Sequence, residues 1–191
     1  MTKELPSPEL LRKLLRYEPE TGKLFWKFRP REMFVTKNIF GTWNTRWANA
    51  EAFTAVDGSG YKQGHAAGKH FRAHRVVWAV HFGRWPNHEI DHINGIKTDN
   101  RICNLRDVRH HDNMKNVSVP QASKSGHVGV RWVQEYRRWY AVIGNSGKRL
   151  YLGSFATKEG AIAARKQAEI EMGYHPNHGR TTCPTAKGYT R

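Results

Sequence analysis

Residues 89–108 read EIDHINGIKTDNRICNLRDV, and this stretch decides the fold that the sequence predicts for the middle of the chain. Residues 89–93 predict a short strand that ends at Asn94-Gly95, a strong turn signal. A loop and a second strand over 105–108 follow, and residues 112–117 predict a helix. The stretch therefore predicts two strands and a helix around a polar loop.

The same stretch carries side chains suited to cutting a phosphodiester bond. A neutral histidine such as His92 can take a proton from water near pH 7. A hard cation such as Mg²⁺ prefers oxygen ligands and keeps several waters, so one carboxylate and one amide oxygen suffice. Asp91 and His92 are neighbours on the predicted strand and point to opposite faces. This placement suits one metal ligand and one base that reach a phosphate from different sides.

Several spaced elements resemble the HNH endonuclease family, whose fold is a ββα-metal finger. They are His74-Arg-Val-Val-Trp78, Asp91-His-Ile-Asn-Gly95, Asp99-Asn-Arg101, Asn104-Leu-Arg106 and Asn113-Met-Lys-Asn116. The resemblance covers roughly residues 74–117 and implies metal-dependent cleavage of DNA. It also implies that His92 is the general base, that Asn104 orients it, and that Asp91 and Asn113 are the metal ligands.

The last motif position departs from many members of the family, which place a histidine ligand where this chain has Asn113. His110 and His111 lie just before it, and either is an alternative ligand. The expected cofactor is a divalent metal, Mg²⁺ first. A histidine ligand would shift the preference toward Mn²⁺, Ni²⁺ or Zn²⁺.

The last third of the chain has a different character. Residues 127–133, 139–143 and 149–152 predict three strands, and Thr157 predicts the start of an alanine-rich helix that ends before Gly173. Basic and aromatic side chains interleave along the strands, so one face of the sheet is expected to bind DNA. The candidate DNA-binding residues are Arg131, Trp132, Arg138, Trp139, Lys148, Arg149 and Tyr151.

This segment resembles the AP2/ERF type of DNA-binding domain over roughly residues 125–174. The matching pieces are Gly129-Val-Arg131, Trp139-Tyr-Ala141 with Ile143, Tyr151-Leu-Gly153 with Phe155, and the alanine-rich helix. The resemblance implies that Arg131, Arg149 and Tyr151 contact DNA. Val128, Val142 and Gly144 stand where plant relatives commonly carry polar contact residues. For Trp139, a place in the core and a DNA contact remain equal alternatives.

The N-terminal third is expected to support the nuclease domain, because a ββα finger is too small to fold alone. Its predicted elements are a helix over 7–16 capped by Ser7, a strand over 24–28, an ordered loop over 34–55, strands over 61–65 and 70–73, and a helix over 74–82. The fold class expected for the whole chain is α+β. The predicted domains are residues 1–118 and 126–175, with a linker at 119–125 and a flexible tail at 176–191.

Charge points to a polyanionic partner. The 191 residues carry a formal net charge of +16, and residues 1–57, 58–120 and 121–191 contribute +3, +5 and +8. This excess favours nucleic acid. No apolar run is long enough to span a membrane, and the N-terminus has no apolar core of a signal peptide. Cys103 and Cys183 are too few for a disulfide framework or a four-cysteine zinc site. A cytoplasmic protein is expected, in a bacterial host if it is of the phage type.

Taken together, these patterns predict a metal-dependent DNA endonuclease of the homing or phage HNH type, targeted to double-stranded DNA by a C-terminal domain. One alternative is a DNA-binding regulator with an inactive HNH finger, and another is a protein that binds or cuts RNA. The DNA target, nicking against double-strand cutting, and monomer against homodimer stay open.

Overall fold

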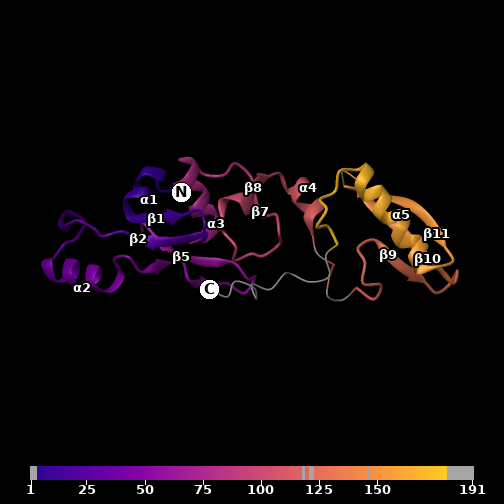
Figure 1. Cartoon of the computed structure of the whole chain (residues 1–191), viewed down its shortest axis with the longest axis horizontal. Helices are drawn as coiled ribbons and strands as arrows, with labels where there is room; N and C mark the ends of the chain where they lie inside the picture. Colours follow the sequence, from indigo (N-terminus) through magenta and orange to yellow (C-terminus); the bar gives the residue numbers. More distant parts are fainter. Residues whose placement is uncertain (1–3, 118, 121–122, 146, 180–191) are drawn as a thin grey trace. The chain divides into compact units, whose positions relative to one another are not determined.

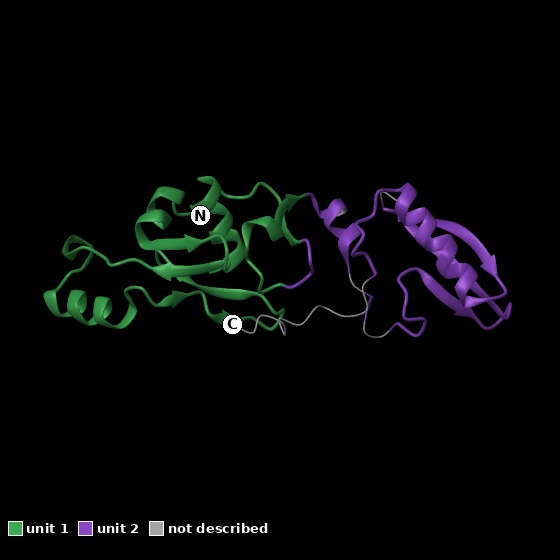
Figure 2. Cartoon of the chain, viewed as in Figure 1, with its two compact units in different colours: residues 1–92, 97–108 green, residues 93–96, 109–191 purple. Residues whose placement is uncertain are grey.

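A computed structural model describes residues 4–117, 119–120, 123–145 and 147–179. The chain forms two compact units, one of residues 1–92 with 97–108 and one of residues 93–96 with 109–191 (Figure 2). The second unit therefore takes in residues 109–117, and the predicted domain boundaries stay predictions. None of the helices in the described ranges has the length and apolar character that crossing a membrane requires.

The first unit begins with a helix that leads straight into a sheet. Helix α1 (Pro8–Leu14) is capped by Ser7, whose Oγ accepts from the backbone N–H of Leu10, as predicted. Strands β1 (Leu15–Glu18), β2 (Lys23–Trp26) and β3 (Glu51–Ala52) form an antiparallel sheet in that order. The predicted helix and the predicted strand over 24–28 are confirmed, with ends displaced by one or two residues.

The expected ordered loop over 34–55 is wrong. The structure places the 3₁₀ turn η1 (Arg31–Met33) just before this range and helix α2 (Lys37–Trp47) inside it. Thr36 caps α2 through its Oγ1, which accepts from Ile39 N. Phe40, Trp43 and Trp47 follow at spacings of three and four residues, so their rings share one side of the helix. Both signals are present in the sequence.

A second sheet and a central helix complete the core of the first unit. Strands β4 (Ala55–Val56), β5 (Lys62–Ala66) and β6 (Lys69–Arg72) pair antiparallel, and helix α3 (Ala73–Phe82) follows β6 directly. Gly83 ends α3 with a φ of 70°, which suits glycine. The core that packs around α3 contains, among others, Leu11, Leu15, Leu24, Val76, Val77, Ile90 and Leu105.

Residues 89–108 form the antiparallel strand pair β7 (Glu89–His92) and β8 (Leu105–Val108), as predicted. Its register places Asp91 opposite Arg106 and His92 opposite Leu105. The 3₁₀ turn η2 (Ile102–Asn104) leads into β8. The helix predicted over 112–117 is instead the short helix α4 (His110–Asn113) followed by the 3₁₀ turn η3 (Met114–Asn116). The ββα-metal arrangement stays a prediction.

The second unit contains the three predicted strands and the predicted helix. Strands β9 (Val130–Val133), β10 (Arg138–Asn145) and β11 (Lys148–Phe155) form an antiparallel sheet in the order β11-β10-β9. Helix α5 (Lys158–Glu171) begins after Thr157, whose Oγ1 accepts from Gly160 N, and packs against one face of the sheet (Figure 1). An α+β fold class is therefore confirmed, while the AP2-like arrangement stays a prediction.

The end of the described chain packs back on other parts of the second unit. Asn177 donates from Nδ2 to the carbonyl of Ile93 at 2.9 Å, and Gly179 N donates to the carbonyl of Val117 at 2.8 Å. Residues 176–179 of the predicted tail are thus hydrogen-bonded. Residues 180–191 lie outside the described residues, as do residues 121–122 of the predicted linker.

Candidate active site

His92 ends β7 as a buried imidazole with a defined partner. His92 is only 3% exposed, and its Nε2 lies 3.0 Å from Oδ1 of Asn100. Because that amide oxygen is an acceptor, Nε2 carries the hydrogen and the lone pair of the neutral ring is on Nδ1. The hydrogen bond therefore fixes both the ring orientation and the tautomer.

Asn100 is itself held by the N-terminal sheet. It is 1% exposed, and its carbonyl accepts a hydrogen bond of 3.0 Å from the hydroxyl of Tyr17 in β1. The turn between β1 and β2 contains Gly22 at a φ of 72°, where an added Cβ would lie 2.5 Å from Arg101 N. Only a glycine lets that turn approach the backbone next to Asn100.

Asn104, the residue expected to orient His92, supports the same loop. It is buried at the end of η2, and its Nδ2 donates to the carbonyl of Asp99 at 2.8 Å. Asp99 in turn accepts from Arg101, with 2.6 Å between Oδ2 and Nη2. These bonds fix the loop that carries Asn100.

Asp91, one residue before His92, is 9% exposed and lies in a strong ion pair. Its Oδ2 accepts from Nε of Arg106 at 2.8 Å and lies 2.7 Å from Nη2 of the same side chain. The two residues face each other across β7 and β8. Metal-binding carboxylates are commonly oriented by such hydrogen bonds. Arg106 belongs to a motif noted in the sequence, where it was given no role, and the structure makes it the partner of Asp91.

Aromatic rings surround His92. The ring of His74 in α3 lies edge-on at 5.2 Å between centroids, and the ring of Tyr61 lies at 5.8 Å. Arg72 and Lys97 place their cations 4.3 and 5.0 Å from the centroid of Tyr61.

Burial lowers the pKa of His92, while the hydrogen bond to Asn100 and the charge of Asp91 oppose that shift. The ring is therefore neutral at pH 7, as a general base requires.

The other predicted ligand positions lie in the second unit. Asn113 is the last residue of α4 and is partly buried, and His110 at the start of the same helix is exposed. Among the described residues, no three His, Cys, Asp or Glu side chains gather as a metal site. Asp91 instead offers a single carboxylate, which fits a hard cation that keeps several waters and completes its shell with amide oxygens.

The C-terminal sheet presents a basic and aromatic face away from α5. The register pairs Tyr140 with Arg131, Gly144 with Arg149 and Val142 with Tyr151, so Arg131, Arg149 and Tyr151 share the face that Tyr140 occupies. Tyr140 stacks on Tyr136 at 6.0 Å between centroids and meets Tyr151 at 5.4 Å. Tyr136 and Tyr140 were not among the candidate contact residues, although the sequence places both among the basic residues of this segment.

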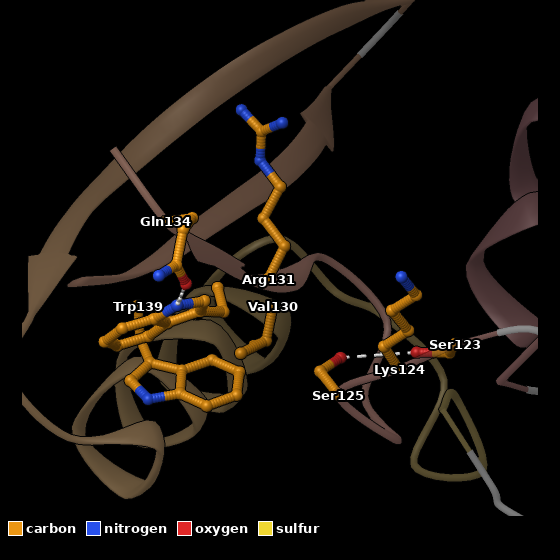
Figure 3. A pocket seen from close by; sticks show the side chains of 8 residues that line it. Ser123, Lys124, Ser125, Val130, Arg131, Gln134 and Trp139 are labelled. Carbon is orange, nitrogen blue, oxygen red and sulfur yellow. Dashed lines mark hydrogen bonds between the residues drawn. The ribbon is translucent and has the colours of Figure 1, made fainter. Parts of the chain in front are cut away.

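The remaining candidates of this sheet have different places. Trp139 packs against the core of Val130, Ala141 and Ala161, and its ring meets that of Trp132 at 5.4 Å. Figure 3 shows the cavity beside them, where Arg131 and Val130 leave β9 in opposite directions. Arg138 begins β10 and bonds the carbonyl of Ser154 through Nη2. Lys148 pairs with Asn145 at the far end of the sheet.

Comparisons with known proteins address the middle of the chain. Residues 71–115 match the family model described as HNH endonuclease. This range contains α3, β7, β8, α4 and all four residues of the predicted nuclease site. The HNH resemblance is therefore confirmed for this part of the chain, whereas the AP2/ERF resemblance stays a prediction.

One curated relative is a phage protein. The chain is 32% identical over 79 residues to "Protein 3.8" of Escherichia phage T7. The match takes in 41% of this chain and 65% of that relative, so the chain spans about two thirds of its length. No solved structure matches the chain.

His74 gives the first unit a pH-dependent stability. It is 5% exposed, its Nδ1 is buried without a hydrogen bond among the described residues, and burial lowers its pKa to about 3. Between pH 6.5 and 3 the unfolded chain binds a proton that the folded chain refuses, so stability falls as the pH falls. We expect His74→Phe to flatten this slope by roughly 1 kcal/mol per pH unit in urea unfolding. Equal slopes for both proteins would contradict the assignment.

Proposed function

We propose that this chain is a metal-dependent endonuclease that hydrolyses duplex DNA, with His92 as general base and the C-terminal sheet as the main DNA-binding surface. One observation carries the proposal. A buried imidazole, fixed in one tautomer by Asn100 and one residue after the buried Asp91 on β7, lies inside the stretch that matches the HNH endonuclease model.

The chemistry follows from the position of each group. His92 takes a proton from water while the water oxygen attacks phosphorus, the bond from phosphorus to the leaving oxygen breaks, and that oxygen takes up a proton from solvent water. A bound divalent cation such as Mg²⁺ supplies positive charge that offsets the charge growing on the phosphate and the leaving oxygen. Asp91 would hold that cation, with Arg106 fixing its carboxylate. Asn113 is proposed as a further ligand on the strength of the family resemblance.

The basic face of the C-terminal sheet is the surface through which the enzyme binds DNA. A twisted antiparallel sheet of this size fits a DNA major groove. Arg131 and Arg149 suit phosphates or guanine edges, and Tyr151 suits sugars and thymine methyl groups. Tyr136, which is exposed, and Tyr140, which is partly exposed, add contact area beside them. A phage or homing role is proposed from the resemblance to the T7 protein and from the pairing of a nuclease with a DNA-binding domain.

A DNA-binding regulator with an inactive finger is the rival, because the same basic sheet would serve it equally well. Supercoiled plasmid incubated with purified protein separates the two. The nuclease predicts nicked or linear product with Mg²⁺ or Mn²⁺ and none with EDTA. Intact plasmid across several sequences and both metals would favour the regulator. Structured RNA is offered as a second substrate under the same conditions, and faster loss of the RNA than of the plasmid would favour a ribonuclease instead.

Asn100 is expected to matter for the rate and not for DNA affinity. Asn100→Ala removes the acceptor that fixes the tautomer of His92, and groups of this kind typically contribute 10–100-fold, so we expect a loss of about that size in the cleavage rate. Asn100→Asp retains an oxygen at the same place and should recover part of the rate. Unchanged cleavage by the alanine variant would show that another group orients the ring.

A further inference from the structure

Residues 27–48 form an arm of the first unit that the nuclease chemistry does not use. The loop from Lys27 to Thr36 and helix α2 pack on each other, and Asn44 is the buried residue of that helix. Figure 1 shows α2 projecting away from the sheets and the other helices of this unit. The arm therefore contributes little to the hydrophobic core.

The arm is nevertheless built to hold one shape. Asn44 accepts from Arg29 N through Oδ1 and donates to the carbonyl of Arg29 through Nδ2, both at 2.9 Å. A chain of ring contacts links Phe28 to Phe40, Phe40 to Phe34, Phe34 to Trp43 and Trp43 to Trp26, with centroids 5.8–5.9 Å apart. A rigid arm of this kind presents its outer side chains in a fixed arrangement.

Large apolar side chains lie on the outside of the arm. Val35 is 92% exposed and Phe28 60%, and Ile39 and Met33 are exposed as well. All four lie within residues 28–39, and exposed apolar surface gathered in one place commonly marks a binding site.

Charge identifies the partner. Residues 27–47 contain five cations, Lys27, Arg29, Arg31, Lys37 and Arg46, and one anion, Glu32. Within the described part of the chain none of these cations forms an ion pair. Arg29 stacks its guanidinium 3.8 Å from the centroid of Trp43, which fixes a positive charge on the arm without neutralising it. A surface that is both cationic and apolar suits a partner that combines closely spaced phosphates with a groove that admits apolar side chains.

We propose that this arm is a second DNA-binding element, which places Met33 and Val35 in the minor groove and its cations on the flanking phosphates. Minor-groove proteins combine these two features, since they use Arg or Lys together with an apolar wedge between base steps that bends the duplex. The inference rests on the proposed function for the choice of duplex DNA. An anionic lipid surface is the rival partner, because basic amphipathic segments also bind membranes.

Two variants of the full chain test the proposal by binding, independently of cleavage. The triple variant Arg31→Ala, Lys37→Ala, Arg46→Ala should weaken binding to a short duplex at least tenfold. It should also lower the slope of log affinity against log salt by about 2–3, the value for three phosphate contacts. The matched control Lys13→Ala, Arg84→Ala, Lys166→Ala makes the same charge change at exposed sites outside residues 27–48. It should keep the wild-type slope.

The wedge has its own readout. Met33→Ser with Val35→Ser keeps every charge, so it should retain the salt slope of DNA binding. It should reduce the bending of the duplex, which is measured as fluorescence resonance energy transfer between dyes at its two ends. Arm variants that match the control in both assays would overturn the proposal. Loss of binding to phosphatidylserine vesicles with unchanged DNA binding would assign the arm to membranes instead. Wild-type protein that binds and bends DNA through the arm but does not cut would refute the nuclease alone.

Discussion

His92→Ala is expected to lower DNA cleavage at least ~100-fold, because general base catalysis typically contributes 10²–10⁴. DNA affinity should stay at the wild-type level, since the basic face of the C-terminal sheet is untouched. The measurement is the single-turnover cleavage rate at saturating protein, beside the affinity for the same duplex. His70→Ala removes an exposed imidazole from β6 and serves as the matched control.

His92 is buried, so its loss could also weaken the fold. Thermal unfolding of the variant and of His92→Gln separates the two effects, because glutamine keeps a polar side chain of similar size. A folded His92→Gln protein that cleaves as fast as the wild type would contradict the role of general base. Loss of DNA binding together with loss of folding would point to a structural histidine.

The second large effect is expected at the C-terminal sheet. Arg131→Ala with Arg149→Ala removes two cations from the face that carries Tyr140 and Tyr151. The salt slope of binding should fall by about 2, and the affinity should fall by roughly tenfold or more at moderate salt. Fluorescence anisotropy with a labelled duplex over a salt series measures both quantities.

The matched control for this prediction lies on helix α5. Lys158→Ala with Lys166→Ala removes two cations from the helix that covers the opposite face of the sheet. It should leave the salt slope near the wild-type value. A smaller slope in the control than in the sheet variant would show that DNA is bound on the helix side.

Local signals explain what the sequence predicted well. Ser7 and Thr157 are helix caps whose hydroxyl oxygens each accept a backbone N–H three residues later, and Asn94-Gly95 lies one residue beyond the end of β7. The strand alternation of β9, β10 and β11 is also a local pattern. These features depend on residues a few positions apart, so one sequence is enough to find them.

Long-range packing explains what the sequence did not predict. Helix α2 has local signals in its Thr36 cap and in the spacing of its rings, and it is further supported by Trp26 and Arg29, whose ring and guanidinium contact Trp43. Asn100 reaches His92 because Tyr17 and Gly22, some eighty positions earlier, hold its loop in place. Nothing in the local sequence around residue 100 distinguishes that role from ordinary loop support. The motif did give Asp91 and His92, while their partners Arg106 and Asn100 required the structure.

The most direct test of His92 as general base, and of the need for a divalent cation, is a single-turnover experiment on duplex DNA labelled on both strands. Wild-type protein and His92→Ala are bound to the DNA in EDTA, excess Mg²⁺ is added, and the products are separated on a denaturing gel. The proposed mechanism predicts discrete cuts that appear after Mg²⁺ addition with the wild type and are at least ~100-fold slower with the variant. Cutting in EDTA, or equal rates for the two folded proteins, would contradict it.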